Sequence, residues 1–132
     1  MADLGDPLTG STDFRVCLYD ETAGNASLVV GVAVPSADES CATCWKALTS
    51  GYRYSAADRS MMLIMKANTT GRASIAARAT VTFNGPASSG QLVNQDPRVI
   101  VQLVSSTGVC WESTFWSPPS RASATAFSDR SP

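Results

Sequence analysis

The chain has 132 residues, 44% of them hydrophobic, and a formal net charge of −1, which is typical of a globular protein long enough to bury one core. The near-neutral charge argues against a nucleic-acid partner, because a phosphate-binding surface needs clustered Lys and Arg. The chain contains no histidine, which excludes Ser-His-Asp and Cys-His catalysis and His-liganded zinc or copper.

Residues 1–11 are small, polar and turn-prone, and we expect them to form a linker or flexible arm. They contain no basic region followed by an apolar run, so we expect no signal peptide. A secreted protein with this sequence would then be a mature fragment or an excised domain. No stretch approaches the roughly 18 apolar residues of a membrane-spanning helix, so we expect no membrane span.

Strand-like patterns follow one another along residues 12–119. Phe14 to Tyr19 alternates with a period of two, which indicates a half-buried strand, and Ser27 to Val34 indicates a more deeply buried strand paired with it. Residues 45–48 could be one helical turn or a short strand. Further strands are predicted at 51–54, 72–83, 98–104 and 109–116. The apolar run at 61–67 could be a helix by its Met and Leu content, but its short length favours a buried strand. Pro118-Pro119 ends regular structure before a C-terminal tail at 120–132.

About seven strands, with turns at intervals of roughly ten residues and no convincing long helix, predict an all-β fold. We expect an antiparallel β-sandwich, immunoglobulin-like or jelly-roll, over residues 12–119, and we expect disulfide bonds to stabilise it.

The four cysteines, Cys17, Cys41, Cys44 and Cys110, allow three pairings. We expect Cys17–Cys41 and Cys44–Cys110, whose closed loops would contribute roughly 3 and roughly 4 kcal/mol, so that reduction lowers the melting temperature substantially. A Cys41–Cys44 bond would close a small ring suited to redox chemistry, but no βαβ context accompanies it. A zinc site would need two close cysteine pairs, and only one C-x2-C occurs. We expect no metal and no cofactor.

Aromatic residues provide the candidate ligand site. Tyr52 and Tyr54 lie two positions apart, so on a strand they share one face, as a flat platform for sugar rings requires. Together with Trp116 they form the predicted binding residues, and the expected ligand is a polysaccharide or another cell-surface polymer. Trp45 and Trp111 each follow a cysteine, and we expect them to pack in the core, as a Trp beside a disulfide does in immunoglobulin domains.

The acidic residues form no recognisable site. Asp20-Glu21 and Asp38-Glu39 could bind calcium, but neither follows the D-x-D-x-D-G pattern, so solvated loops are predicted. Asp58 and Glu112 could act as the acid and base of a glycosidase, but the sequence does not place them at the required separation. We therefore assign no catalytic residue.

The chain from about Phe14 onward resembles a Cys-Trp module found at the C-terminal end of large secreted proteins of myxobacteria and related bacteria. The resemblance rests chiefly on Arg15 to Asp20, Cys44 to Leu48, Gly51 to Tyr54, Gly108 to Phe115 and Phe127 to Ser131. It implies an extracellular or cell-surface location and a parent multidomain protein, and it implies no activity.

Three hypotheses for function follow. The first is a non-catalytic accessory module of a secreted bacterial protein that binds a glycan or cell-surface polymer through exposed aromatic side chains. The second is a structural, assembly or anchoring module without a small ligand, which would use the exposed strand edges of a sandwich. The third is a glycan-active enzyme that uses carboxylates.

Overall fold

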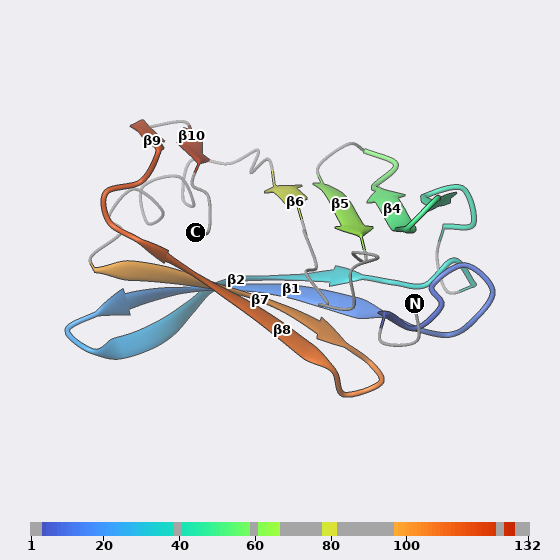
Figure 1. The fold of residues 1–132 in the computed structure, drawn as a ribbon, viewed down its shortest axis with the longest axis horizontal. Coiled ribbons are helices and arrows are strands. Elements are labelled where there is room, and N and C mark those ends of the chain that lie inside the picture. Colours follow the sequence, from blue (N-terminus) through green and yellow to red (C-terminus); the bar gives the residue numbers. More distant parts are fainter. Residues whose placement is uncertain are drawn as a thin grey trace. The chain divides into compact units, whose positions relative to one another are not determined.

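The computed structural model describes residues 4–38, 41–58, 61–66, 78–81, 97–123 and 126–128. These residues form ten β-strands and no α-helix (Figure 1). The strands are β1 (Phe14–Thr22), β2 (Asn25–Val34), β3 (Trp45–Leu48), β4 (Gly51–Ser55), β5 (Met61–Lys66), β6 (Arg78–Val81), β7 (Arg98–Ser105), β8 (Cys110–Trp116), β9 (Arg121–Ser123) and β10 (Ala126–Ser128). They pair into two four-stranded sheets, β2-β1-β7-β8 and β3-β4-β5-β6, and a two-stranded sheet of β9 and β10. The predicted all-β class is confirmed, and both sheets that the predicted sandwich requires are present.

The chain divides into two compact units, each assembled from three separate stretches, so neither unit is a continuous domain. The first unit contains the β3–β6 sheet, and the second contains most of β1, β2, β7 and β8. Their stretches are Met1–Phe14, Ala33–Thr82 and Val104–Val109 for the first, and Arg15–Val32, Phe83–Leu103 and Cys110–Pro132 for the second.

Two hairpins build the β2-β1-β7-β8 sheet. Ala23 and Gly24 connect β1 to β2 with φ angles of 53° and 82°. Positive φ at both turn residues is the geometry whose twist matches the flanking strands. The turn between β7 and β8 is closed by the Ser105 N–H, which donates to the Val109 carbonyl at 2.8 Å. Both hairpins agree with the sequence prediction.

The deep burial predicted for residues 27–34 is wrong. In the part of the chain that the structure describes, β2 lies at the edge of its sheet with β1 as its one neighbour. Only Val34 is buried in this strand, and Leu28 is 51% exposed. An apolar run is compatible with a fully buried strand, but its position within a sheet depends on distant strands that the local pattern does not report.

The β3-β4-β5-β6 sheet is an antiparallel meander. Residues 45–48 form a strand rather than a helical turn, and Trp45 pairs with Tyr54 across β3 and β4. The apolar run predicted at 61–67 forms strand β5 and not a helix, and Met61, Leu63 and Met65 are each at most 3% exposed. Of the strand predicted at 72–83, Arg78–Val81 forms β6, and the remainder lies outside the described residues.

Described residues of two segments, the predicted flexible arm at 1–11 and the predicted tail at 120–132, form more regular contacts than expected. In the N-terminal segment, Leu4 and Pro7 are fully buried, and the Pro7 carbonyl accepts a hydrogen bond from the Ala37 N–H at 2.8 Å. Asp6 accepts hydrogen bonds from the Thr9 hydroxyl and from the N–H groups of Thr9 and Leu8, which lower its pKa. In the predicted C-terminal tail, β9 and β10 pair as a short antiparallel hairpin.

No helix among the residues that the structure describes has the length and apolar character needed to cross a membrane.

Candidate functional site

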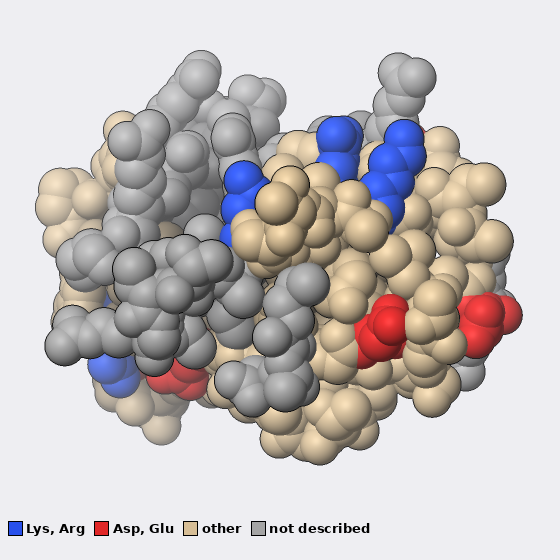
Figure 2. All heavy atoms as spheres, turned by 45° about the vertical axis from the view of Figure 1, so that its right-hand side comes forward, with Lys and Arg blue, Asp and Glu red and all other residues tan. Residues whose placement is uncertain are grey.

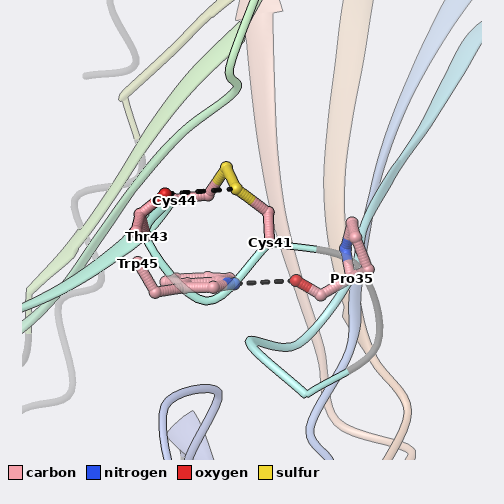
Figure 3. The surroundings of a disulfide bond; sticks show 5 residues. All are labelled: Pro35, Cys41, Thr43, Cys44 and Trp45. Carbon is pink, nitrogen blue, oxygen red and sulfur yellow. Dashed lines mark hydrogen bonds between the residues drawn. A yellow bond between two sulfur atoms is a disulfide. The ribbon is translucent and has the colours of Figure 1, made fainter.

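The disulfide bond joins Cys41 to Cys44 (Figure 3). Both predicted pairings, Cys17–Cys41 and Cys44–Cys110, are therefore wrong. The reason is local: the Cys44 N–H donates to the Cys41 carbonyl at 3.0 Å, closing a tight turn, and the two Cα atoms lie 5.3 Å apart. That separation is within the range that a disulfide needs.

Cys17 and Cys110 are free thiols, the first buried and the second exposed. Cys17 lies on β1 and Cys110 on β8, and β7 separates these strands in the sheet. Two strand spacings amount to about 10 Å, which is beyond the roughly 7 Å limit for a disulfide between Cα atoms. Within the described residues no group of three or more His, Cys, Asp or Glu side chains is placed to hold a metal ion.

Reduction of the Cys41–Cys44 bond is expected to lower the free energy of unfolding by about 2 kcal/mol, because so short a loop removes little entropy from the unfolded chain. For a domain of this size the melting temperature should fall by about 5–10 °C. The measurement is thermal denaturation with and without a reductant. Since Cys110 is unbonded, Cys110→Ser should leave the response to reductant unchanged; loss of the response in that variant would contradict the observed pairing.

Trp45 packs in the core of the first unit, as predicted. It is 3% exposed, and its indole Nε1–H donates to the Pro35 carbonyl at 2.7 Å (Figure 3). Its ring centroid lies 5.9 Å from that of Phe14 and 5.1 Å from that of Tyr54. Trp45 is therefore a structural residue whose ring faces are closed to a ligand. Trp111 was also predicted to pack in the core, but it is half-buried on β8.

The predicted tyrosine platform faces this core. Tyr52 and Tyr54 share one face of β4, as the sequence indicates, but that face carries Trp45 on the neighbouring strand. Tyr54 is 8% exposed and Tyr52 is half-buried. Burial raises the pKa of both hydroxyls, and the Asp58 carboxylate raises that of Tyr54 further. Tyr54 therefore offers no free ring face for stacking.

Trp116, the third predicted binding residue, is 55% exposed at the end of β8. The Arg98 guanidinium lies 5.3 Å from the centre of its ring, within cation–π distance. Arg98 is itself held by an ion pair with Glu21, whose side chain is 10% exposed. The neighbouring carboxylate therefore fixes the arginine beside the indole ring.

The face of β7 and β8 that carries Trp116 contains several polar side chains, interspersed with Ile100, Val104 and Cys110. Because alternate residues of a strand share a face, Glu112 lies on the face of Trp116, and Gln102 lies on that of Arg98. The Gln102 amide donates to Glu112 at 2.8 Å, which confirms that both belong to the same face of the hairpin. On the opposite face Val99 and Leu103 are buried. We define the β7–β8 polar face as Arg98, Gln102, Glu112, Thr114 and Trp116.

The acidic residues considered for catalysis or for calcium make contacts of other kinds. Glu112 accepts a hydrogen bond from the Gln102 amide, and Glu21 is paired with Arg98. Asp58 follows β4 and acts electrostatically on Tyr54. Of the pair Asp38-Glu39, Asp38 is exposed and Glu39 lies outside the described residues.

The polar partners of Trp116 were not predicted, although their spacing carries a signal. Arg98 and Gln102 are four residues apart on one strand, and Glu112 and Trp116 are four residues apart on the next. Period-two counting therefore places each pair on one face. What the sequence lacks is the register that brings the two pairs opposite each other.

Comparison of the chain with protein families, with curated proteins and with solved structures finds no match.

Proposed function

We propose that the chain is a non-catalytic binding module that holds a glycan or another cell-surface polymer on the β7–β8 polar face, with Trp116 as the stacking ring. The observation that carries the proposal is the exposure of Trp116 beside a fixed arginine. Large aromatic side chains are usually mostly buried, and an exposed Trp with ordered polar neighbours is characteristic of a binding surface.

The polar face complements a sugar in two ways. A flat indole ring covers the apolar face of a sugar ring, while the Gln102 amide, the Glu112 carboxylate and the Arg98 guanidinium provide donors and acceptors for hydroxyl groups. Because the Glu21 carboxylate already holds Arg98, little side-chain entropy is lost when a ligand arrives.

Retention on insoluble neutral polysaccharides, followed by tryptophan fluorescence, tests the proposal. Trp116→Ala is expected to weaken binding at least tenfold, roughly the effect of losing a central aromatic contact. Leu28→Ala is the matched control, since Leu28 is the other large exposed apolar side chain among the described residues and is 51% exposed. Equal affinity of Trp116→Ala and the wild-type chain would refute stacking at this residue.

An assembly module is the second candidate, and the edge strand β2 favours it. Residues 25–29 of this strand are half-buried or exposed, and Leu28 projects from it. An exposed edge of this length can accept a strand from another chain. Light scattering after size-exclusion chromatography distinguishes the candidates: a strictly monomeric chain that is retained on polysaccharide would count against assembly.

An extracellular or cell-surface location and a parent multidomain protein belong to the same proposal. Their support is the resemblance to the Cys-Trp module and the Cys41–Cys44 disulfide, a bond that persists mainly in oxidising compartments.

A further inference from the structure

A pocket of about 300 Å³ lies on the first unit, beside the disulfide and the β3–β4 hairpin. Two basic side chains, Lys46 and Arg53, line it together with Thr43, Cys44 and Ser55. None of these residues belongs to the β7–β8 polar face, so the pocket is a separate feature of the molecule.

The two cations face the same side of the sheet. Lys46 and Arg53 are directly opposite each other in the β3–β4 register, and both are exposed. Their neighbours along the strands, Trp45 and Tyr54, pair in the core, so the alternation of each strand turns the two basic residues outward. Like charges placed directly opposite each other reduce stability, and an anion between them would remove that penalty.

Neither Lys46 nor Arg53 forms an ion pair with a carboxylate in the part of the chain that the structure describes. The one ion pair found there joins Arg98 to Glu21, in the other unit. Strands β3 to β6 contain four basic residues and no Asp or Glu; the basic residues are Lys46, Arg53, Lys66 and Arg78. In Figure 2, basic side chains gather in the upper part of the view with no acidic side chain between them.

Hydroxyl groups and a fixed turn complete the pocket. Thr43 and Ser55 provide donors suited to an oxyanion. Thr43 lies inside the ring closed by the disulfide, and its Oγ1 is 3.8 Å from the Cys41 Sγ (Figure 3). The Ser55 N–H donates to the Cys44 carbonyl at 2.8 Å, which ties the turn to β4. The backbone of the turn that carries Thr43 and Cys44 is therefore held in place before a ligand binds.

We propose that this pocket binds the anionic group of an acidic polysaccharide, a carboxylate or a sulfate ester, between Lys46 and Arg53. Guanidinium and ammonium donors form their strongest hydrogen bonds with such oxyanions. A nucleic acid is the less favoured polyanion, because the chain carries a net charge of −1 and a phosphate backbone needs many cationic contacts. The inference does not depend on stacking at Trp116.

The test measures binding of the whole chain to polygalacturonate, dextran sulfate and neutral dextran at low and high salt. Lys46→Gln and Arg53→Gln are each expected to weaken binding of polygalacturonate about tenfold, roughly one charge-assisted contact. High salt should weaken it as well. Lys66→Gln is the matched control: it removes the same charge from the same sheet but from outside the pocket lining, and should change affinity by less than about threefold.

Each outcome decides the inference. An equal loss of affinity in Lys66→Gln would indicate general attraction to a basic surface and would overturn the proposed pocket site. Failure of both acidic polymers to bind the wild-type chain would also overturn it. Tighter binding of a single-stranded polynucleotide than of either acidic polymer would overturn the ligand class. Binding of dextran sulfate alone would assign the sulfate ester as the source of the anion. Trp116→Ala should leave binding of the acidic polymers intact, so failure of the stacking proposal is distinguished from failure of this one.

Discussion

Replacement of Trp45 by alanine is expected to lower the free energy of unfolding by about 3–5 kcal/mol, the usual cost of removing a large buried aromatic side chain. The indole ring contacts Phe14, Tyr52 and Tyr54 and is 3% exposed. Its removal therefore leaves a cavity in the core, which water can fill only by contacting buried side chains. Small domains are stable by about 5–15 kcal/mol, so this variant loses much of its stability. Urea denaturation followed by circular dichroism measures the change.

Trp45→Phe separates packing from hydrogen bonding. Phenylalanine keeps most of the buried area but cannot donate to the Pro35 carbonyl, so we expect a smaller loss of about 1–3 kcal/mol. Trp111→Phe, at the half-buried tryptophan of β8, is the matched control and should cost less than either change. A Trp45→Ala variant as stable as Trp111→Phe would contradict the central place of the indole ring in this core.

The second large effect is expected for Gly51→Ala, with a loss of about 3 kcal/mol or more. A Cβ atom on Gly51 would overlap the Met65 carbonyl oxygen and lie 3.0 Å from the Lys66 Cα. Both are backbone atoms of the paired strand β5, so no side-chain rotation relieves the clash, and the two strands must move apart. Overpacking of this kind costs more when the backbone has to shift. Chemical denaturation measures the difference in unfolding free energy.

Gly24→Ala provides the comparison for that variant. Gly24 has a φ of 82° in the β1–β2 turn, but nothing lies within 4 Å of a Cβ atom built there. Its replacement should therefore cost only the strain of a left-handed residue, about 1 kcal/mol. If the two variants proved equally stable, β4 and β5 could not approach each other as closely as the structure has them.

Local patterns were sufficient to predict most strands but not their surroundings. The alternation in residues 14–19 and 98–104 repeats every two positions, and a period of two is a property of the strand alone. Residues 61–66 are a continuous apolar run, and its short length is what favours a strand there. The sequence likewise places Tyr52 and Tyr54 on one face. Whether that face meets solvent or core depends on Trp45 in the adjacent strand, and that contact is a matter of register.

Features that depend on distant parts of the chain could not be predicted. The edge position of β2 follows from the pairing of β1 with β7, which joins segments on either side of the whole middle of the chain. The disulfide was missed for the opposite reason. The cysteine spacing was interpreted as a link between strands, whereas a single tight turn at residues 41–44 brings the two sulfur atoms together.

The strand order also has a consequence for how the chain folds. Strands β3 to β6 pair in the order in which they occur, so this meander can form from contacts between neighbouring segments. The pairing of β1 with β7, by contrast, closes a long loop, as the 77-residue separation of Glu21 and Arg98 shows. Contacts between residues so far apart in the sequence slow folding, because the chain loses conformational entropy before these contacts form. During synthesis on the ribosome, the meander can therefore form before β7 and β8 are available to pair with β1, and the surface around Trp116 forms only after the meander.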